Sequence, residues 1–168
     1  MSDGPNYKVK FRRRRDFKTN YTKRLALLKS GKARLVVRKT NAGMVCEVTE
    51  YKPLGDMVKA FQSASSLKKL GWKANTGNIP SAYLCGYACA KKALKAGVTE
   101  AVLDIGLATP IHGGRIFAAL KGAIDAGLSV PADAAVFPKE DRANGKHIGI
   151  ETAKNLEEAK KTIDKEFG

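Results

Sequence analysis

The stretch PSAYLCGYACAKKALKAGVTEAVLDI, residues 80–105, contains the two patterns that decide the fold class. Pro80 suits the first turn of a helix, and Gly97 stands where a helix that runs to residue 95 or 96 stops. The small residues of this helix recur at spacings of three and four and allow close approach to a sheet: Ala82, Cys85, Cys89 and Ala93. The near-continuous apolar run AVLDI, residues 101–105, is typical of a strand buried on both faces.

Outward from this stretch, the sequence predicts strands before it and helices on both sides. The runs RLVVRK (34–39) and MVCEVTEY (44–51) flank the turn cluster 41–43 and indicate a hairpin. Residues 56–64 alternate as a third strand, with a helix that reaches residue 70 as the alternative. We expect helices at 21–30, 114–126 and 151–167, loops at 71–78, 106–113 and 131–148, and a short strand at most at 128–130. The prediction is therefore an α/β domain with a mixed β-sheet and packed helices.

The basic residues are concentrated at the N-terminus. The 168 residues include 31 Lys and Arg against 16 Asp and Glu, for a formal net charge of +15. Residues 1–40 hold 14 of these cations, and their only acids are Asp3 and Asp16. Such a segment repels itself and has too few apolar side chains to fold alone. We expect a basic N-terminal arm at 1–20, extended or irregular until it meets a partner, then a globular domain at 21–150 and a C-terminal helix at 151–168.

This charge balance favours a polyanionic partner, either nucleic acid or an anionic membrane, over a generic small-molecule enzyme. Tyr7, Phe11, Phe17 and Tyr21 are interleaved with the cations, and aromatic rings stack on bases while cations neutralise phosphates. A membrane-binding arm needs an amphipathic periodicity that this segment lacks. A solvated tail or a localisation signal is the alternative. No apolar stretch approaches the ~20 residues of a transmembrane helix, and we expect no signal peptide and no membrane partner.

The residues that could carry catalysis or bind metal form no complete site in the sequence. Cys85 and Cys89 supply only two of the about four ligands that zinc needs, so we interpret them as small buried side chains. Asp104 ends the predicted strand at 101–105, and on paper it could join Asp125 and Asp133 in an acidic cluster of the two-metal nuclease type. Asp104 could equally bond the backbone of the loop that follows it. The sequence contains no hydrolase, metalloprotease or phosphate-cradle motif.

Two glycine-containing loops have open interpretations. The run from His112 to Arg115 precedes a helix and could hold a phosphate at the free N–H groups of its glycines, or it could be an ordinary turn. Trp72, the single tryptophan, lies beside Lys73 and could stack on a base or anchor its loop to the core.

Several blocks of the sequence, in the same order, resemble one known family. The N-terminal blocks are GPNYKV (4–9), RRRR (12–15), TNY (19–21), LKSGK (28–32) and RLVVRK (34–39). The later blocks are GW (71–72), TGN (76–78), PSAYL (80–84), AVLDIGL (101–107), FA (117–118) and GAIDAG (122–127). They resemble the eighteenth family of large-subunit ribosomal proteins, which binds 5S ribosomal RNA, in its archaeal and eukaryotic form. The resemblance covers residues 4–150, and the helix that begins at Glu151 is the segment that differs most from the family.

The resemblance implies a ribonuclease-H-like arrangement without catalytic acids, a non-enzymatic structural role on the cytoplasmic ribosome, and no cofactor or metal. It implies that 5S ribosomal RNA is bound and docked onto the large ribosomal RNA at the central protuberance, beside neighbouring proteins that include the other 5S-binding protein. We expect RNA contacts from Tyr7, Lys8, Lys10, Phe11, Arg12, Arg13, Arg14, Arg15, Lys18, Thr19, Tyr21, Lys23, Arg24, Lys32, Arg34, Arg38, Lys39 and Arg115.

Two other functions remain open at this point. A metal-dependent nuclease of related fold would use Asp104 and Asp125, and Asp104→Ala would abolish its cleavage. A non-specific polyanion-binding module would bind heparin, DNA and RNA equally at matched charge.

Overall fold

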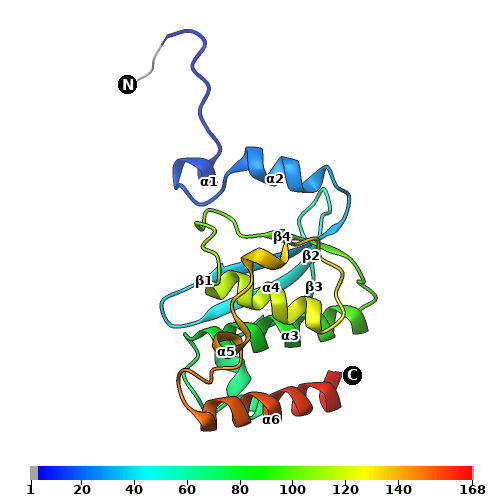
Figure 1. Ribbon diagram of the computed structural model, residues 1–168. Coiled ribbons are helices and arrows are strands. Elements are labelled where there is room, and N and C mark those ends of the chain that lie inside the picture. Colours follow the sequence, from blue (N-terminus) through cyan, green and yellow to red (C-terminus); the bar gives the residue numbers. More distant parts are fainter. Residues whose placement is uncertain (1–3, 168) are drawn as a thin grey trace.

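The computed structural model describes residues 4–167, so residues 1–3 of the expected arm and residue 168 lie outside the described part. A four-stranded mixed sheet with the order β3-β2-β1-β4 lies at the centre (Figure 1). Strands β1 (Ala33–Lys39), β2 (Met44–Glu50) and β3 (Met57–Ser63) form an antiparallel meander, and β4 (Ala101–Asp104) runs parallel to β1. This confirms the hairpin, the third strand and the mixed sheet, and the order is consistent with a ribonuclease-H-like arrangement.

The helices lie in layers on both sides of the sheet. Helices α3 (Ile79–Lys95) and α4 (Arg115–Asp125) pack on one face, and α6 (Ile150–Phe167) packs on the far side of α3 (Figure 1). Helix α2 (Tyr21–Leu28) and the single turn α1 (Arg12–Arg15) lie beyond the opposite face. The 3-10 turns η1 (Ser65–Leu70) and η2 (Ala134–Val136) and the short α5 (Glu140–Ala143) complete the fold.

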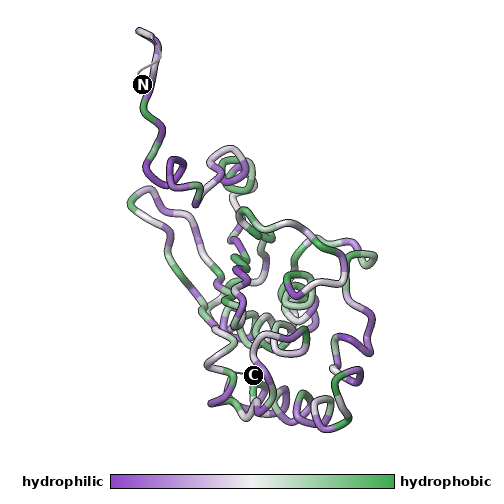
Figure 2. Tube along the Cα trace, turned by 90° about the vertical axis from the view of Figure 1, so that its left-hand side faces the viewer, coloured by the Kyte–Doolittle hydropathy of each residue, from purple (hydrophilic) through white to green (hydrophobic). Residues whose placement is uncertain are grey.

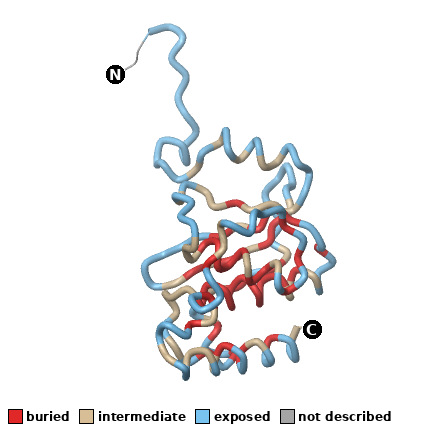
Figure 3. Tube along the Cα trace, viewed as in Figure 1, coloured by how far each residue is buried: buried red, intermediate tan, exposed pale blue. Residues whose placement is uncertain are grey.

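The alternation along β1 separates a buried face from a charged face. Leu35 and Val37 are fully buried against the helices, whereas Arg34, Val36 and Arg38 point to the other side, because successive side chains alternate across a strand. Figure 3 shows the buried residues gathered between the sheet and α3, and Figure 2 shows the most hydrophilic run at α1. We call the face toward α3 and α4 the inner face and the face toward α2 the outer face.

Helices α3 and α4 cross with their backbones almost in contact. A Cβ built at Gly86 would lie 1.9 Å from the carbonyl oxygen of Ala119, and one built at Gly122 would lie 2.1 Å from that of Tyr83. The predicted stripe Ala82, Cys85, Cys89 and Ala93 is buried as expected. The closest approach of α3, however, is to α4 and depends on the two glycines.

Helix α6 confirms the predicted C-terminal helix and docks through polar and apolar contacts. Leu156, Ala159 and Ile163 are buried, and Phe167 is half-buried under Lys92. The hydroxyl of Tyr87 donates to Asp164 at 2.8 Å, and the Lys160 ammonium lies 4.4 Å from the ring centroid of Tyr83. Burial and the bond to Asp164 raise the pKa of Tyr87 to about 12, so it remains a donor at neutral pH.

Three expectations about local structure are wrong or incomplete, and one is met. Strand β4 lies at the edge of the sheet, and Val102 and Leu103 are half-buried rather than buried on both faces, because an edge strand has a neighbouring strand on one side only. Residues 128–130 form a single parallel bridge, Glu100 to Ser129, which agrees with the expectation of a short strand at most. Residues 12–15, expected to be irregular or extended, form the turn α1. The region 131–148 contains η2 and α5 rather than loop alone.

Candidate nucleic-acid interface

Every residue from 4 to 18 is exposed, and this segment leads into the outer face of the sheet. The four arginines of α1 occupy one helical turn, so their guanidinium groups point to all sides. No ion pair of the described residues involves Arg12, Arg13, Arg14 or Arg15. Arg13 is oriented by a 2.8 Å hydrogen bond from its Nε to the hydroxyl of Thr19. The segment therefore presents cations that are free to meet an anion.

The aromatic residues of this segment are exposed or half-exposed. Phe11 packs on Tyr21 with 5.1 Å between ring centroids, which braces α1 against α2. Phe17 has a left-handed backbone with φ of 51° and is 84% exposed. A bulky residue rarely adopts positive φ, and here this conformation ends α1 and leaves the ring in solvent. Phe17 was counted among the aromatics of the sequence but not among the expected RNA contacts, and its geometry adds it as a candidate.

Helix α2 sits over the outer face without burying any residue in it. Its first turn is closed by Asn20, whose side-chain oxygen accepts from the backbone N–H of Lys23. Arg24 is the main link to the body, because its Nη2 lies 2.8 Å and 2.9 Å from the two carboxylate oxygens of Asp56. The prediction of a helix from Tyr21 is thus confirmed, and it ends at Leu28, two residues earlier than expected.

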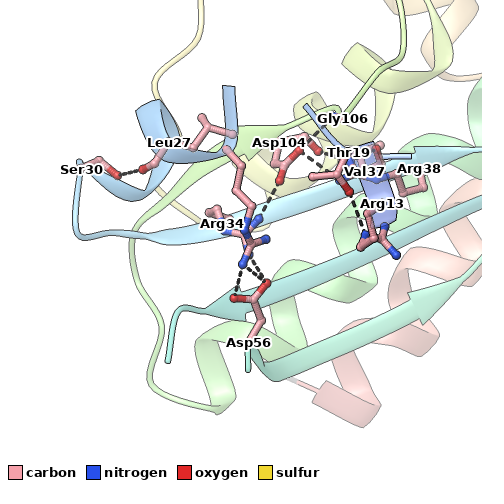
Figure 4. Close-up of polar contacts among 11 residues, drawn as sticks. Arg13, Thr19, Leu27, Ser30, Arg34, Val37, Arg38, Asp56, Asp104 and Gly106 are labelled. Carbon is pink, nitrogen blue, oxygen red and sulfur yellow. Dashed lines mark hydrogen bonds and ion pairs between the residues drawn. The ribbon is translucent and has the colours of Figure 1, made fainter. Parts of the chain in front are cut away.

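Arg34 lies at the centre of a buried ion-pair network (Figure 4). It is 2% exposed, and it pairs with Asp56 on one side and, at 2.7 Å, with Asp104 on the other. Arg34, which we expected to contact RNA, is therefore buried and does not belong to the exposed basic surface. Asp56 and Asp104 bind its guanidinium through Nη2 and Nη1 respectively, and the side chain is only 3% exposed.

The two carboxylates of this network are held in their charged form. Burial raises the pKa of Asp56, but the hydrogen bond from Arg24 and the charge of Arg34 outweigh it, and the pKa lies below its ordinary value. Burial acts likewise on Asp104 and is outweighed by the charge of Arg38 and the hydrogen bond from the N–H of Gly106, so this pKa is lowered too. The acids on the outer face are thus compensated by arginines, and the face remains attractive to anions.

The acidic cluster expected of a nuclease is not formed. Asp104 bonds Arg34, Arg38 and the Gly106 N–H, as in the alternative that it orders its own loop. Asp125 accepts from the hydroxyl of Tyr83 on the helical side of the sheet, and Asp133 caps η2. No group of three or more His, Cys, Asp and Glu in residues 4–167 is close enough to hold a metal ion.

The predicted cationic contacts fall into two groups. Within residues 4–167, ion pairs engage Lys18, Arg24, Lys32, Arg34 and Arg38. The other predicted cations form no ion pair in this part of the chain: Lys8, Lys10, Arg12, Arg13, Arg14, Arg15, Lys23, Lys39 and Arg115. A cation of the first group has to share its donors between a carboxylate and a phosphate or exchange one for the other, whereas a cation of the second group does not.

A groove opens between α2 and the sheet. Its volume is about 800 Å³, and α2 and the chain just before it form one wall. Arg38, the end of β4 and the loop from Ile105 to Leu107 form the other wall. Sequence patterns place β4 and α2 separately, but the space between them arises only from the tertiary arrangement.

The structure shows what Trp72 and Arg115 contact in the two glycine-containing loops. Trp72 is 1% exposed and its indole N–H donates to the Asn75 carbonyl, so it anchors its loop to the core. Arg115 donates through Nη1 to the carbonyl oxygens of Thr40 and Gly77, at 3.1 Å each, and ties two loops together. This structural use of Arg115 lends no support to a phosphate contact, which stays a prediction.

The cysteines have the structural role that we expected. All three are buried and free, and the Cys85 thiol donates to the carbonyl oxygens of Gln62 and Met44. Burial raises the pKa of Cys89 to about 12, and the hydrogen bond with Cys85 together with burial raises the pKa of Cys46. Cys46 and Cys89 therefore stay protonated, which makes them poor metal ligands.

An α/β body that displays a cationic, aromatic-containing segment on one face defines a protein that binds polyanions. No helix within residues 4–167 combines the length and apolar character that crossing a bilayer requires.

Comparison with known proteins identifies the family. The model of the family described as ribosomal large subunit proteins 60S L5 and 50S L18 matches residues 5–100 and 95–133. The large ribosomal subunit protein uL18 of Korarchaeum cryptofilum is 48% identical over 99% of this chain and 85% of its own length. The proteins of the same name from Thermofilum pendens and Methanothermobacter thermautotrophicus are each 48% identical, over 95% and 94% of this chain and 81% and 82% of their own lengths.

The chain belongs to this family of ribosomal large subunit proteins. It is therefore a structural protein of the large ribosomal subunit, and its place in the cell is the cytoplasmic ribosome.

Proposed function

We propose that this protein binds 5S ribosomal RNA and helps to attach it to the large-subunit ribosomal RNA at the central protuberance. Its other partners there are neighbouring ribosomal proteins, including the second 5S-binding protein. The observation that carries the proposal is the run of exposed residues 4–18, in which cations alternate with aromatic rings and, of the cations, only Lys18 has an ion pair within the described residues. Phosphate contacts and base stacking are the two interactions by which proteins hold RNA with unpaired regions.

The proposed contacts start from the cations that no carboxylate engages. Lys8, Lys10 and the four arginines of α1 meet phosphates directly, while Tyr7, Phe11 and Phe17 stack on bases or fill gaps in the minor groove. Lys32 joins by exchanging Glu100 for a phosphate, which costs little, since a half-exposed ion pair contributes only ~0–1 kcal/mol. Arg24 and Arg38 keep their bonds to Asp56 and Asp104 and offer their remaining N–H donors to phosphates. Arg34 is left out of this set.

We infer further that the protein is not an enzyme. In the described residues Asp104 is the buried acid nearest to the groove, and it is committed to two arginines and a backbone N–H. A general base or metal ligand needs a free carboxylate at the surface of its site. The residues at the groove instead offer hydrogen-bond donors, cations and apolar side chains, which bind rather than react.

The test is a titration of the whole chain against 5S ribosomal RNA at two salt concentrations, with transfer RNA as competitor. With about six phosphates neutralised, the logarithm of the binding constant should fall against the logarithm of salt with a slope of roughly −4 to −5. The 5S RNA should also compete better than transfer RNA. A flat salt response, or equal competition by transfer RNA, contradicts the proposal.

A further inference from the structure

The groove between α2 and the outer face differs from the exposed segment before it, because it is concave and is lined by both cationic and apolar side chains. Cations lie along it on both walls, with Arg13 and Lys23 on one wall and Arg38 on the other. Leu27 of α2 faces Ile105 and Leu107 of the opposite wall across the same space. At about 800 Å³ it falls within the ~300–1,000 Å³ of pockets that enclose small organic ligands.

The groove combines this shape with a positive charge. Its lining includes five cations against two acids, and Asp56 and Asp104, the two acids, are each engaged by two arginines. An anionic group that enters the groove thus meets arginine and lysine, and no free carboxylate repels it. The aromatic pair Tyr21 and Phe11, 5.1 Å apart, stands beside this space, and Tyr21 is part of the lining.

We propose that the groove takes one unpaired nucleotide of the bound RNA, with its phosphate at the cations and its base between Tyr21 and the apolar wall. This rests on the proposed function, RNA binding, and adds the form in which RNA enters this site. A base offers two apolar faces and a polar edge, which match Leu27, Leu107 and the polar side chains of Thr19 and Asn20. The sugar-phosphate backbone of a duplex has no apolar face that could pack against Leu107. A peptide of Asp and Glu residues has no ring that could stack on Tyr21.

The position of α2 also fits this occupant. No residue of α2 is buried, and Arg24 holds the helix to the body through Asp56. Leu107 is 53% exposed although it faces this space, so the apolar wall remains available to a ligand. A base inserted here buries Leu107 and packs against α2, which buries no residue against the sheet itself.

The experiment probes the Watson–Crick edges of 5S ribosomal RNA with dimethyl sulfate and a carbodiimide in complexes saturated with protein. The variants are Leu107→Glu, which puts a carboxylate into the groove, and Ala26→Phe, which narrows it from α2. Leu54→Glu is the matched control, because it makes the same charge change at a fully exposed leucine outside the groove. All three positions are exposed, so the fold is expected to persist, and thermal unfolding of each variant checks this.

The wild type and Leu54→Glu should both protect one unpaired base by about tenfold, as expected from the ~1–3 kcal/mol of one stacked base. Leu107→Glu and Ala26→Phe should leave that base reactive while backbone protection elsewhere persists. Identical base protection in all four proteins overturns the groove proposal and leaves 5S binding standing. If the wild type shows no preference for 5S over transfer RNA, the proposed function fails and the groove proposal fails with it.

Discussion

The inner and outer faces of the sheet use the same strands for opposite purposes. On β1, Leu35 and Val37 enter a dry core closed by α3 and α4, whereas Arg34 and Arg38 on the other face enter an ion-pair network below α2. The inner face gains stability from apolar burial and from close backbone contact. The outer face keeps its charge and leaves a groove open. The apolar core and the proposed RNA-binding surface thus lie on opposite sides of one strand.

The largest effect on the inner face is expected from Gly86→Ala. The added Cβ would meet the carbonyl oxygen of Ala119 at 1.9 Å, so the crossing of α3 and α4 has to open. We expect the free energy of unfolding to fall by more than about 4 kcal/mol, measured by urea titration. Gly149→Ala is the control, because nothing lies within 4 Å of its Cβ. Equal stability of the two variants would mean that the helices do not touch at this crossing.

The next effect tests the boundary between the two faces. Arg34→Met leaves Asp104 buried with only Arg38 as its cationic partner, and loss of one member of a buried pair costs about 3 kcal/mol or more. Urea unfolding should show this loss. The salt dependence of RNA binding, measured where the variant is folded, should stay that of the wild type, since Arg34 is covered. A reduced salt slope with unchanged stability would place Arg34 in the RNA contact set after all.

A smaller effect is expected from pH. The pKa values of Asp56 and Asp104 are lowered in the folded protein, so the stability that they contribute is present above their unfolded pKa of about 4. This stability is lost as the pH falls through the lower, folded values. The urea midpoint should therefore drop below about pH 4, and it should drop less in Asp56→Asn. A midpoint that rises on acidification would show that the network does not stabilise the fold.

The smallest effect is expected at the rim of the outer face. Lys32 pairs with Glu100 at 2.6 Å, but both side chains are about half-exposed. Lys32→Ala should change the free energy of unfolding by less than about 1 kcal/mol, because such pairs are solvated and screened. Urea titration at low and high salt checks this. A loss as large as that of Arg34→Met would contradict the division between covered and exposed ion pairs.

Local sequence patterns predicted most of the inner face. The alternation of RLVVRK and MVCEVTEY, together with Pro80 and the terminal glycine Gly97, was sufficient to place the hairpin and α3. The pattern of small residues on α3 predicted the contact of this helix with the sheet, but it did not predict the contact of Gly86 with α4. A close approach of two backbones depends on both partners, and no single helix pattern contains the second one.

The outer face was predicted less well, for a physical reason. Arginine is seldom fully buried, so the sequence alone predicts that Arg34 is exposed. Its burial depends on Asp56 and Asp104, which are 22 and 70 residues away in sequence and lie beside it only in the folded protein. The groove depends in the same way on α2 meeting the loop after β4. Phe17 was overlooked as a contact because its left-handed backbone has no signal in the residue type.

The role of the arginines of α1 in RNA binding is tested by removing the same charge from two regions of the protein. One variant replaces Arg12, Arg13, Arg14 and Arg15 by Gln. The other replaces by Gln four lysines that are exposed on the helical side of the protein: Lys68, Lys69, Lys95 and Lys161. The binding of 5S ribosomal RNA is then titrated against salt for both. We expect the arginine variant to lose about a hundredfold in affinity and its salt slope to fall by about 3, and we expect the lysine variant to match the wild type. Equal losses in the two variants would show that the protein binds RNA only as a polycation and that residues 12–15 have no special role.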